Sequence, residues 1–368
     1  MSPTPFTKLG FNFYGYGNVG DDMMLAGFLK VWPESRPLFS VVSRSQCSIL
    51  SRRFPNVKWI AEGGAEPEYD LWLGVGDTPI QVLSGLFFLE YLEVELERAR
   101  SNGAKVVFLG VGAEREALRE RARFSKVLEN VDLLLTRDAA THQILVHDFA
   151  IEPSSVYLGG DLAHIYLQEI IGPQWGLADR PLEIAVNYYA ERKRRRSSLV
   201  ALRWLQEQQS MAKTVAFLSN EARLLDGLEA RHYAELAWVT CLNSRREAVA
   251  LLSPNRWAAS LDDMVAHFAT IQTVMSSRYH CLLLAAWSGC RTYGLGRSSK
   301  IESLCGDIDI EFTSERALSN DALDRGMERA KRVPLSLLNS KADRSREAVR
   351  RALAQVGAGH GLQHVPTR

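Results

Sequence analysis

The sequence predicts an α/β protein with two domains, each built on a parallel β-sheet. Short apolar runs alternate with amphipathic helical segments along most of the chain, a pattern typical of parallel sheets covered by helices. Residues 172–181 contain two glycines and two prolines, and this segment is predicted to connect the domains. A chain of 368 residues is long enough for two domains of ordinary size.

The first predicted domain covers residues 1–171. Its strands are expected at residues 9–14, 38–42, 58–60, 71–75, 105–109, 131–135 and 156–158. Its helices are expected at residues 22–31, 85–101 and 139–146. Glycine-rich turns follow three of the strands, near Gly15, Gly74 and Gly110, and would let backbone approach a ligand closely. Together these three turns predict a cleft lined by glycine-rich loops.

The second predicted domain covers residues 182–320. Its strands are expected at residues 182–186, 214–218, 248–252 and 271–275, and its helices at 198–209, 229–238 and 281–289. Ser260 opens a further helix with a start that resembles a capping box. Charged amphipathic helices near 322–333 and 344–356 form a C-terminal region, 321–356, expected on the outside, with a return to the first half as an open alternative. Residues 357–368 are predicted to be a disordered tail.

Composition argues against several classes of function. Hydrophobic residues make up 46% and charged residues 24% of the chain, and a net charge of +1 creates no overall field for nucleic acid or a membrane surface. The first residues lack the order of a signal peptide, and no apolar stretch has membrane-spanning length, so a cytoplasmic protein is expected. Five cysteines without C-x-x-C spacing fit reduced thiols. No residues have metal-ligand spacing, and neither a metal nor another cofactor is expected.

The tetrapeptide Ser277-Arg278-Tyr279-His280 lies between a predicted buried strand and a predicted helix. Its arginine and its imidazole would therefore lie at the carboxyl end of a strand and the amino end of a helix. Free backbone N–H groups and the helix dipole favour anions there, and open α/β sheets bind ligands at that edge. A fixed positive charge beside a titratable proton donor predicts a site for a small, doubly anionic substrate.

The first glycine loop, residues 14–22, has a different character. Gly15, Gly17 and Gly20 superficially match G-x-G-x-x-G, but Asp21 and Asp22 stand where the pyrophosphate of a dinucleotide would lie. Asp21 would repel phosphate and accept hydrogen bonds from hydroxyl groups instead. The alternative is a carboxylate that only caps a turn. Of the two, hydroxyl binding is favoured.

Arg137 repeats the arrangement around Arg278. Thr136-Arg137 and Ser277-Arg278 each end a predicted strand at the start of a helix. Two similar domains that face each other would thus each contribute one arginine to a shared cleft. The alternative is a local ion pair between Arg137 and Asp138, which would contribute little to stability.

Two single residues and one basic run complete the candidates. Asp161 follows Gly159-Gly160, and Lys300 follows the strand after the Arg278 helix. An ordinary turn residue and a solvated lysine are the alternatives to a role in binding. The basic run 192–196 is more typical of a solvated helix flank than of contact with a phosphorylated or lipid-linked substrate.

Together these elements resemble the polysaccharide pyruvyl transferase family. The resemblance rests on Asn18-Val19-Gly20-Asp21 (N-x-G-D), Arg137-Asp138 (R-D), Asp161-Leu162-Ala163 (the aspartate element), and Arg278-Tyr279-His280 with Gly289 and Lys300 (R-x-H, Gly, Lys). The matches keep the family's order over residues 9–310. The sequence departs at Gly74-Val75-Gly76, where the family has three glycines, and at Asp161-Leu162-Ala163-His164, where it has D-P-A-F. Both departures lie on the side expected to hold the acceptor.

The resemblance implies a fold like that of type B glycosyltransferases, with the ligand in a cleft between two Rossmann-like domains. It implies phosphoenolpyruvate as the donor and a cyclic pyruvate ketal on two sugar hydroxyls as the product, with phosphate released. The second domain would hold phosphoenolpyruvate and the first the sugar or glycan acceptor. A lipid-linked acceptor would associate the protein loosely with a membrane.

The resemblance also suggests roles for the residues. Arg278 would bind the anionic groups of phosphoenolpyruvate, and His280 would transfer a proton or bind phosphate. Lys300 and Arg137 would stabilise the departing phosphate. The acceptor hydroxyls would be bound by Asn18, Gly20, Asp21 and Asp161. Side chains supply the cations in this scheme, so it requires no metal.

Three other functions are alternatives. A sugar transferase with a nucleotide-sugar donor would share the architecture, but residues 288–291 supply no ribose-binding glutamate and Glu302 comes late. A non-catalytic glycan- or anion-binding relative would bind phosphoenolpyruvate without releasing phosphate, and the joint presence of Arg278, His280 and Lys300 argues against it. A nicotinamide-dependent reductase is the weakest alternative, because no glycine loop has the required spacing.

Overall fold

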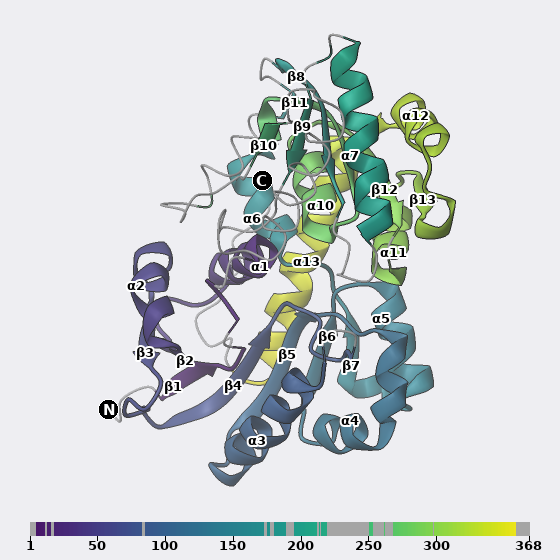
Figure 1. Cartoon of the computed structure of the whole chain (residues 1–368). Coiled ribbons are helices and arrows are strands. Elements are labelled where there is room, and N and C mark those ends of the chain that lie inside the picture. Colours follow the sequence, from purple (N-terminus) through teal and green to yellow (C-terminus); the bar gives the residue numbers. More distant parts are fainter. Residues whose placement is uncertain are drawn as a thin grey trace. The chain divides into compact units, whose positions relative to one another are not determined.

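The computed structural model describes residues 5–11, 13–15, 18–82, 85–172, 175–176, 180–188, 195–211, 213, 215–218, 250–252, 261, 268–296 and 298–357. These residues form two compact units (Figure 1). Unit 1 consists of Met1–Gly15, Asp21–Tyr166 and Ser340–Arg368, and unit 2 of Tyr16–Gly20 and Leu167–Asn339. The predicted helix at 229–238, the helix start at Ser260, most of the basic run 192–196 and the tail from 358 onward lie outside the described residues.

Unit 1 is built on a parallel sheet with the strand order β3-β2-β1-β4-β5-β6-β7. Its strands are β1 Phe6–Leu9, β2 Leu38–Val42, β3 Val57–Ala61, β4 Tyr69–Val75, β5 Lys105–Val111, β6 Leu133–Thr136 and β7 Val156–Leu158. The order runs outward in one direction from β1 and in the other from β4. The carboxyl ends of β1 and β4 therefore flank the topological switch point, where open α/β sheets bind their ligands.

Helices from both ends of the chain accompany this sheet (Figure 1). They are α1 Val19–Leu29, α2 Arg44–Arg53, α3 Phe87–Ser101, α4 Arg121–Leu128, α5 Ala139–Gln143, the first turn of α6 Ala163–Ile170 and the later part of α13 Leu335–Gln355. Between sheet and helices lies an aromatic cluster, in which the Phe11 ring contacts Trp72, Phe88 and Phe108 at centroid distances of 5.7, 5.3 and 5.5 Å. Each such edge-on pair adds about 1 kcal/mol to the burial of the rings.

Unit 2 is built on a second sheet, with the strand order β10-β9-β8-β11-β12-β13 and β14 antiparallel to β12. Its strands are β8 Leu182–Asn187, β9 Val215–Leu218, β10 Ala250–Leu252, β11 Ile271–Ser276, β12 Arg291–Gly296, β13 Phe312–Ser314 and β14 Lys331–Arg332. Described helices include α7 Arg195–Ser210, α10 Tyr279–Trp287, α11 Ser299–Asp307 and α12 Asn320–Arg329. The order reverses between β8 and β11, which places the switch point of this sheet at their carboxyl ends.

Helix α10 is buried on every side, since all nine of its residues are buried. A helix that is apolar all round belongs in the core of a domain. The buried guanidinium of Arg180 donates hydrogen bonds to the main-chain carbonyls of Ile271 (2.6 Å) and Ser288. A cation at this carboxyl end also interacts favourably with the helix dipole. Arg180 therefore ties the end of α10 to the start of β11.

The predicted fold class is confirmed, and most strands within the described residues lie within a few residues of their predicted positions. The first strand was placed wrongly at 9–14: the sheet ladder ends at Leu9, and the apolar run continues because Phe11 packs into the aromatic cluster instead. Helix α2 was missed, although Ser43 and Gln46 form its capping box. The helix predicted at 139–146 ends at Gln143 and continues as a π-helix, Ile144–Asp148.

Candidate active site

Five of the eight predicted site residues follow a strand at one of the two switch points. Asn18, Gly20 and Asp21 follow β1, and Arg278 and His280 follow β11. Because parallel strands end at the same edge of a sheet, the loops and helix starts that follow them gather there. The sequence therefore places polar residues at the position where each sheet would bind a ligand.

Arg278 is the N-cap of α10 and has an extended backbone (φ −107°, ψ 128°). Its N–H donates to the Ser276 hydroxyl (3.0 Å), and that hydroxyl donates to the side-chain carbonyl of Asn187 (3.2 Å). Asn187 ends β8, and its main-chain carbonyl accepts the N–H of Ser277 (2.9 Å). Asn187 and Ser276 thus hold the turn at the switch point and set the position of the Arg278 backbone.

His280 lies in the first turn of α10 and is 8% exposed. Its ring meets the Tyr279 ring edge-on, with centroids 5.1 Å apart. Gly20, which belongs to the same unit, lies against His280 so closely that a Cβ at Gly20 would overlap Nδ1 of the imidazole. Two elements far apart in the sequence, Asn18-Val19-Gly20 and Arg278-Tyr279-His280, therefore meet at this contact, and glycine leaves the room for it.

Lys300 lies in the first turn of α11, directly after β12. A lysine at the amino end of a helix is opposed by the helix dipole, so helix stability does not account for it. Because β12 is the neighbour of β11, helices α10 and α11 begin at the same sheet edge. Two helix amino ends with Arg278 and Lys300 suit this edge to an anion that carries more than one charge.

Arg137, in unit 1, is 6% exposed and follows β6. Its Nη2 lies 3.5 Å from the Thr78 hydroxyl, and its Nε lies 3.4 Å from a carboxylate oxygen of Asp138. The other oxygen of Asp138 accepts the N–H of Thr141 (2.7 Å) and caps α5. A Cβ at Gly112 would overlap the guanidinium. The loops after β4, β5 and β6 thus meet around Arg137, and the ion pair with Asp138 is only one of its contacts.

Buried hydrogen bonds hold the loop between β1 and α1. The Tyr14 hydroxyl donates to the carbonyl of Val75 (2.8 Å) at the end of β4. The N–H of Gly15 donates to Asp22 Oδ1 (2.8 Å), and Asp22 is paired with Arg53. The two acidic residues of the loop therefore differ, because Asp22 has a structural role at the start of α1.

Asp21 lies in the first turn of α1 and is 5% exposed. Burial raises the pKa of Tyr14 well above its ordinary value, and the charges of Asp21 and Asp77 raise this pKa further. Both carboxylates therefore act electrostatically on the Tyr14 hydroxyl, which lies at the end of β4. Asp21 therefore lies at the edge of the first sheet that follows β1, and acceptor binding by Asp21 stays a prediction.

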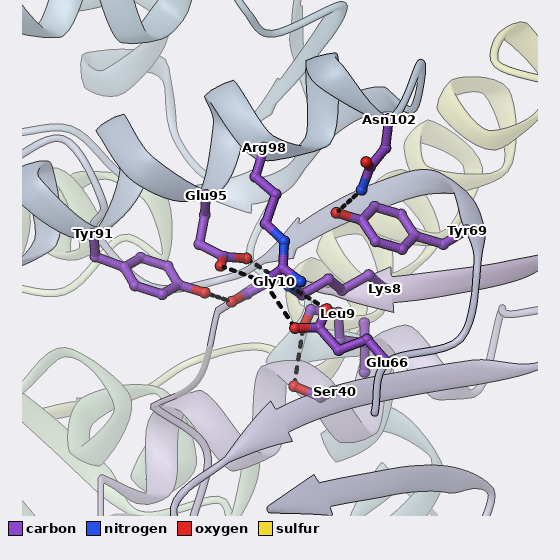
Figure 2. A network of polar contacts seen from close by, with 10 residues as sticks. All are labelled: Lys8, Leu9, Gly10, Ser40, Glu66, Tyr69, Tyr91, Glu95, Arg98 and Asn102. Atoms are coloured by element: carbon purple, nitrogen blue, oxygen red, sulfur yellow. Dashed lines mark hydrogen bonds and ion pairs between the residues drawn. The ribbon is translucent and has the colours of Figure 1, made fainter. Parts of the chain in front are cut away.

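A buried network of ion pairs and hydrogen bonds surrounds Lys8 of β1 (Figure 2). The Lys8 side chain is 3% exposed, and its ammonium pairs with Glu66 (2.9 Å) and Glu95 (2.7 Å). Tyr91, on the same helix α3 as Glu95, donates to the main-chain carbonyl of Gly10. A buried charge needs such partners, because an unpaired one would be strongly destabilising. The network thus joins β1 to α3 just before the loop that leads to Asn18.

A cavity of about 440 Å³ opens near this network, at the amino end of β4. Its lining residues are Pro5, Glu66, Pro67, Glu68, Tyr69, Asp70, Arg98 and Asn102. Glu66 is already paired with Lys8 and Arg98, and Asp70 with Arg36. The cavity lies at the opposite end of the strand from the switch point, and we do not assign it to the site.

Asp161 follows β7, the edge strand. Its carboxylate accepts the N–H of Ala163 (2.8 Å) at the start of α6, and its carbonyl accepts the Ser345 hydroxyl (3.3 Å) from α13. The next residue, Leu162, packs against Gly27 of α1. These contacts give Asp161 a structural role at a helix start, and acceptor binding by Asp161 stays a prediction.

The sequence did not single out Asn187, Ser276, Asp77 or Thr78 as site residues. Asn187 and Ser276 lie at the ends of predicted strands, and only the pairing of β8 with β11 brings them together. Asp77 and Thr78 follow one of the predicted glycine turns. The signal that would have found all four is the strand order, which identifies the strands at each switch point.

Within the described part of the chain, no three His, Cys, Asp or Glu side chains are grouped so that they could hold a metal ion. No helix in the same ranges is long and apolar enough to cross a membrane. Cys47, Cys281, Cys290 and Cys305 are free thiols. Burial raises the pKa of Cys290 to about 11 and that of Cys305 to about 12, so both are protonated at neutral pH.

The architecture is shared with several solved structures. The chain is similar to the UDP-GlcNAc 2-epimerase from Neisseria meningitidis bound to UDP-GlcNAc, with 10% identity, 95% of this chain and 99% of that chain covered, and a TM-score of 0.62. It is similar to Anabaena Alr3699/HepE in complex with UDP, with 9% identity, 95% of this chain and 99% of that chain covered, and a TM-score of 0.58. A putative UDP-N-acetylglucosamine 2-epimerase from Listeria monocytogenes has 10% identity, 99% and 98% covered, and a TM-score of 0.58. Identities this low show the fold alone.

Fold and site together define a two-domain α/β protein of the glycosyltransferase B-like class, with cationic side chains at a helix amino end. No curated protein sequence matches the chain. Residues 18–299, more than half of the chain, match the polysaccharide pyruvyl transferase family. The chain belongs to that family, and the resemblance drawn from its motifs is confirmed.

Proposed function

We propose that this protein transfers pyruvate from phosphoenolpyruvate onto two hydroxyls of a sugar or glycan, as a cyclic ketal, and releases phosphate. The observation that carries the proposal is the start of α10, where Arg278 and His280 follow β11 at the switch point and Gly20 of the N-x-G-D element abuts the His280 ring. Family membership supports a transferase.

Phosphoenolpyruvate carries a carboxylate and a phosphate, and the edge of unit 2 is suited to both. Arg278 would bind one anionic group through its planar guanidinium. Lys300, in the first turn of the neighbouring helix α11, would bind the other together with the free N–H groups of the helix start. Arg137, in unit 1, is assigned to the phosphate as it leaves.

Making the central carbon of phosphoenolpyruvate electrophilic requires protonation of its methylene group. His280 is the proposed proton donor, because an imidazole is both acid and base near neutral pH. One sugar hydroxyl then adds to the carbon, the bond to phosphate breaks, and a second hydroxyl closes the ring.

The acceptor side is assigned to unit 1 and to the loop between β1 and α1. Asn18 and Asp21 would hydrogen-bond to acceptor hydroxyls, Gly20 would let the acceptor approach the backbone, and Asp161 is kept as a further acceptor residue. The buried, acidic character of Asp21 supports a neutral, hydroxyl-rich ligand at this position. The acceptor is therefore proposed to be a sugar ring without a phosphate in contact with Asp21.

The test is a turnover assay with phosphoenolpyruvate and a mixture of methyl glucoside, methyl galactoside and methyl mannoside. We expect equal amounts of released phosphate and of a glycoside that has gained pyruvate minus one water, measured by mass spectrometry. His280→Ala is expected to lower kcat by about 10²- to 10⁴-fold, because it removes the proton donor. The exposed His147, replaced in His147→Ala, is the matched control.

Three results would contradict the proposal. Phosphate release without a modified glycoside would indicate hydrolysis or an unrelated reaction. Near-normal turnover of His280→Ala would remove His280 from the chemistry. Transfer from a nucleotide-sugar in place of phosphoenolpyruvate would make the protein a sugar transferase.

A further inference from the structure

Asp77 stands on the other side of the switch point of unit 1 from the N-x-G-D element. That element follows β1, whereas Gly76, Asp77 and Thr78 follow β4, and these two strands flank the switch point. In open α/β sheets the ligand lies between the loops that follow the two flanking strands. By topology, Asp77 is therefore as close to the expected ligand position as Asp21 is.

Asp77 is accessible where the residues around it are not. From residue 71 through residue 81, every residue except Asp77 is buried. Its Oδ1 accepts the N–H of Thr78 (2.5 Å), which orients the carboxylate. A partly exposed carboxylate in an otherwise buried stretch is within reach of a ligand.

Packing brings Asp77 next to the helix that carries Asp21. A Cβ at Gly76 would lie 2.8 Å from Sδ and 2.9 Å from Cβ of Met24, so this loop contacts α1 at Met24. Asp21 precedes Met24 by three residues, and residues three apart lie on the same face of a helix. Asp21 and Asp77 therefore lie on adjoining surfaces of the same edge.

On its other side, Asp77 adjoins the loops around Arg137. The N–H of Gly112, after β5, donates to the main-chain carbonyl of Asp77 (2.8 Å). Thr78, the next residue, is the one whose hydroxyl lies 3.5 Å from the Arg137 guanidinium. Asp77 thus stands between Asp21 and Arg137 along the edge of the sheet.

We propose that Asp77 is a second acceptor-binding carboxylate, which accepts the proton of one hydroxyl of a neutral sugar diol while Asp21 binds the other. This inference rests on the proposed ketal transfer. In that reaction two C–O bonds form to the central carbon, one C–O bond to phosphate breaks, and both hydroxyls lose a proton. The methylene group gains one of these protons and becomes a methyl group. The phosphate that leaves takes up the other. Two hydroxyls that must lose protons match two carboxylates contributed by the two flanking loops.

The experiment compares Asp77→Asn with Asp70→Asn in the full-length protein. Asparagine keeps the shape of Asp77 and tolerates its left-handed backbone (φ 60°), so the variant is expected to fold. Asp70 lies in the same strand β4 and is exposed, which makes Asp70→Asn the matched control. Thermal unfolding of both variants verifies that they fold. Phosphoenolpyruvate affinity is measured by calorimetry. Turnover is measured on whichever of the three methyl glycosides named above the wild type modifies best.

We expect Asp77→Asn to lower kcat/KM for the glycoside by about 10²-fold or more, because a positioned general base contributes that much. Its phosphoenolpyruvate affinity should stay within about twofold of the wild type. Asp70→Asn should match the wild type in phosphoenolpyruvate affinity and in turnover. These results support Asp77 as an acceptor-binding carboxylate.

The contrary outcomes separate the two proposals. If the wild type forms the ketal and Asp77→Asn does so at a comparable rate, the inference about Asp77 is wrong while the proposed function stands. If Asp77→Asn loses phosphoenolpyruvate binding or unfolds at a much lower temperature, its role is structural and the inference is again wrong. If the wild type binds no phosphoenolpyruvate and forms no ketal, the proposed function is wrong and the inference falls with it.

Discussion

The two sheet edges have the same topology and opposite chemistry. At the same edge of the unit 2 sheet, the groups that follow β11 and its neighbour β12 include Arg278, His280 and Lys300. At the switch point of unit 1, the groups that follow β1 and β4 are the carboxylates Asp21 and Asp77. Helix amino ends occur at both edges, so the backbone favours anions at each of them. The side chains therefore make the two edges differ. Those of unit 2 reinforce the preference for anions, and those of unit 1 oppose it.

Under the proposed function, this difference would let one fold serve two ligands in one reaction. A doubly anionic donor is favoured where cations add to the helix ends, and a neutral polyol is favoured where carboxylates repel phosphate and accept hydroxyl hydrogen bonds. The most informative variants are those that change one edge and leave the other intact.

The largest expected effect concerns the support of α10 in unit 2. Arg180→Ala removes the hydrogen bonds to the carbonyls of Ile271 and Ser288 and leaves these buried acceptors without the guanidinium. The free energy of unfolding should fall by about 3 kcal/mol, since hydrogen bonds to charged groups contribute about 1.5–3 kcal/mol each. Urea unfolding followed by circular dichroism measures the loss. Arg180→Lys should recover part of it, and an unchanged midpoint in Arg180→Ala would show that the contacts are unimportant.

The next effect concerns the contact between Gly20 and His280. Gly20→Ala places a Cβ in the imidazole, so it should cost about 1–3 kcal/mol of stability by overpacking. It should also lower kcat/KM by up to about 10²-fold, because displacing a reacting group by about 1 Å costs that much. Gly306→Ala is the matched control, because Gly306 also lies in a helix and its Cβ would meet nothing within 4 Å. Both variants gain helix propensity, so their difference isolates the contact. Equal activity of the two would mean that Gly20 and His280 do not need to touch.

A smaller effect tests the cationic edge directly. Lys300→Ala should weaken phosphoenolpyruvate binding by about tenfold, because one charge-assisted hydrogen bond contributes about 1.5 kcal/mol. The difference in affinity between the wild type and Lys300→Ala should shrink as salt is added, because salt screens the attraction between Lys300 and phosphoenolpyruvate in the wild type. Calorimetric titration at two ionic strengths measures both. Lys331→Ala, an exposed lysine of the same unit, should leave the affinity unchanged; a similar loss there would point to a general charge effect instead.

The smallest effect is a pH dependence at the acidic edge. Tyr14→Phe removes the hydrogen bond to Val75 and should lower stability at pH 7 by about 1 kcal/mol. The pKa of Tyr14 is raised in the folded state by burial and by Asp21 and Asp77, so the unfolded chain loses its phenol proton first as pH rises above about 10. The stability advantage of the wild type over Tyr14→Phe should therefore be complete below that pH and decline above it.

Urea unfolding of both proteins at pH 7 and at about pH 10.5 measures this difference. A wild-type advantage that grows with pH would contradict the stated electrostatics. In Asp77→Asn the decline should begin at the same pH, which the unfolded chain sets, and should be smaller in total, because the Asp77 charge no longer raises the pKa of Tyr14 in the folded state.

The fold could be predicted from the sequence because its signals are local. Apolar runs such as residues 105–109 and 271–275 are short, are bounded by glycines or polar residues and contain β-branched residues, which favours buried strands. Helix α2 escaped because its composition is mostly polar and its start depends on a capping box of Ser43 and Gln46. The end of β1 was misplaced because the aromatic residues after it pack into the core without continuing the ladder.

The site could be predicted only in part, for a physical reason. The position of Arg278 and His280 between a strand and a helix was predicted because a strand–turn–helix order is visible in a short segment. Asn187 and Asp77 were not, because their importance comes from strand order, which depends on pairings between distant segments. The contact between Gly20 and His280 is likewise a product of tertiary structure, and no spacing in the sequence announces it.

The most direct test of the account is a calorimetric titration of the wild-type protein with phosphoenolpyruvate and, separately, with uridine diphosphate. The same titrations are made on Arg278→Ala and, as a control, on Arg329→Ala, an exposed arginine of the same unit. We predict saturable phosphoenolpyruvate binding that is at least about 30-fold weaker in Arg278→Ala, because truncating one partner of a buried charge pair costs about 2–5 kcal/mol. Binding of uridine diphosphate alone, or phosphoenolpyruvate binding that Arg278→Ala leaves unchanged, would contradict the assignment of the donor to this edge.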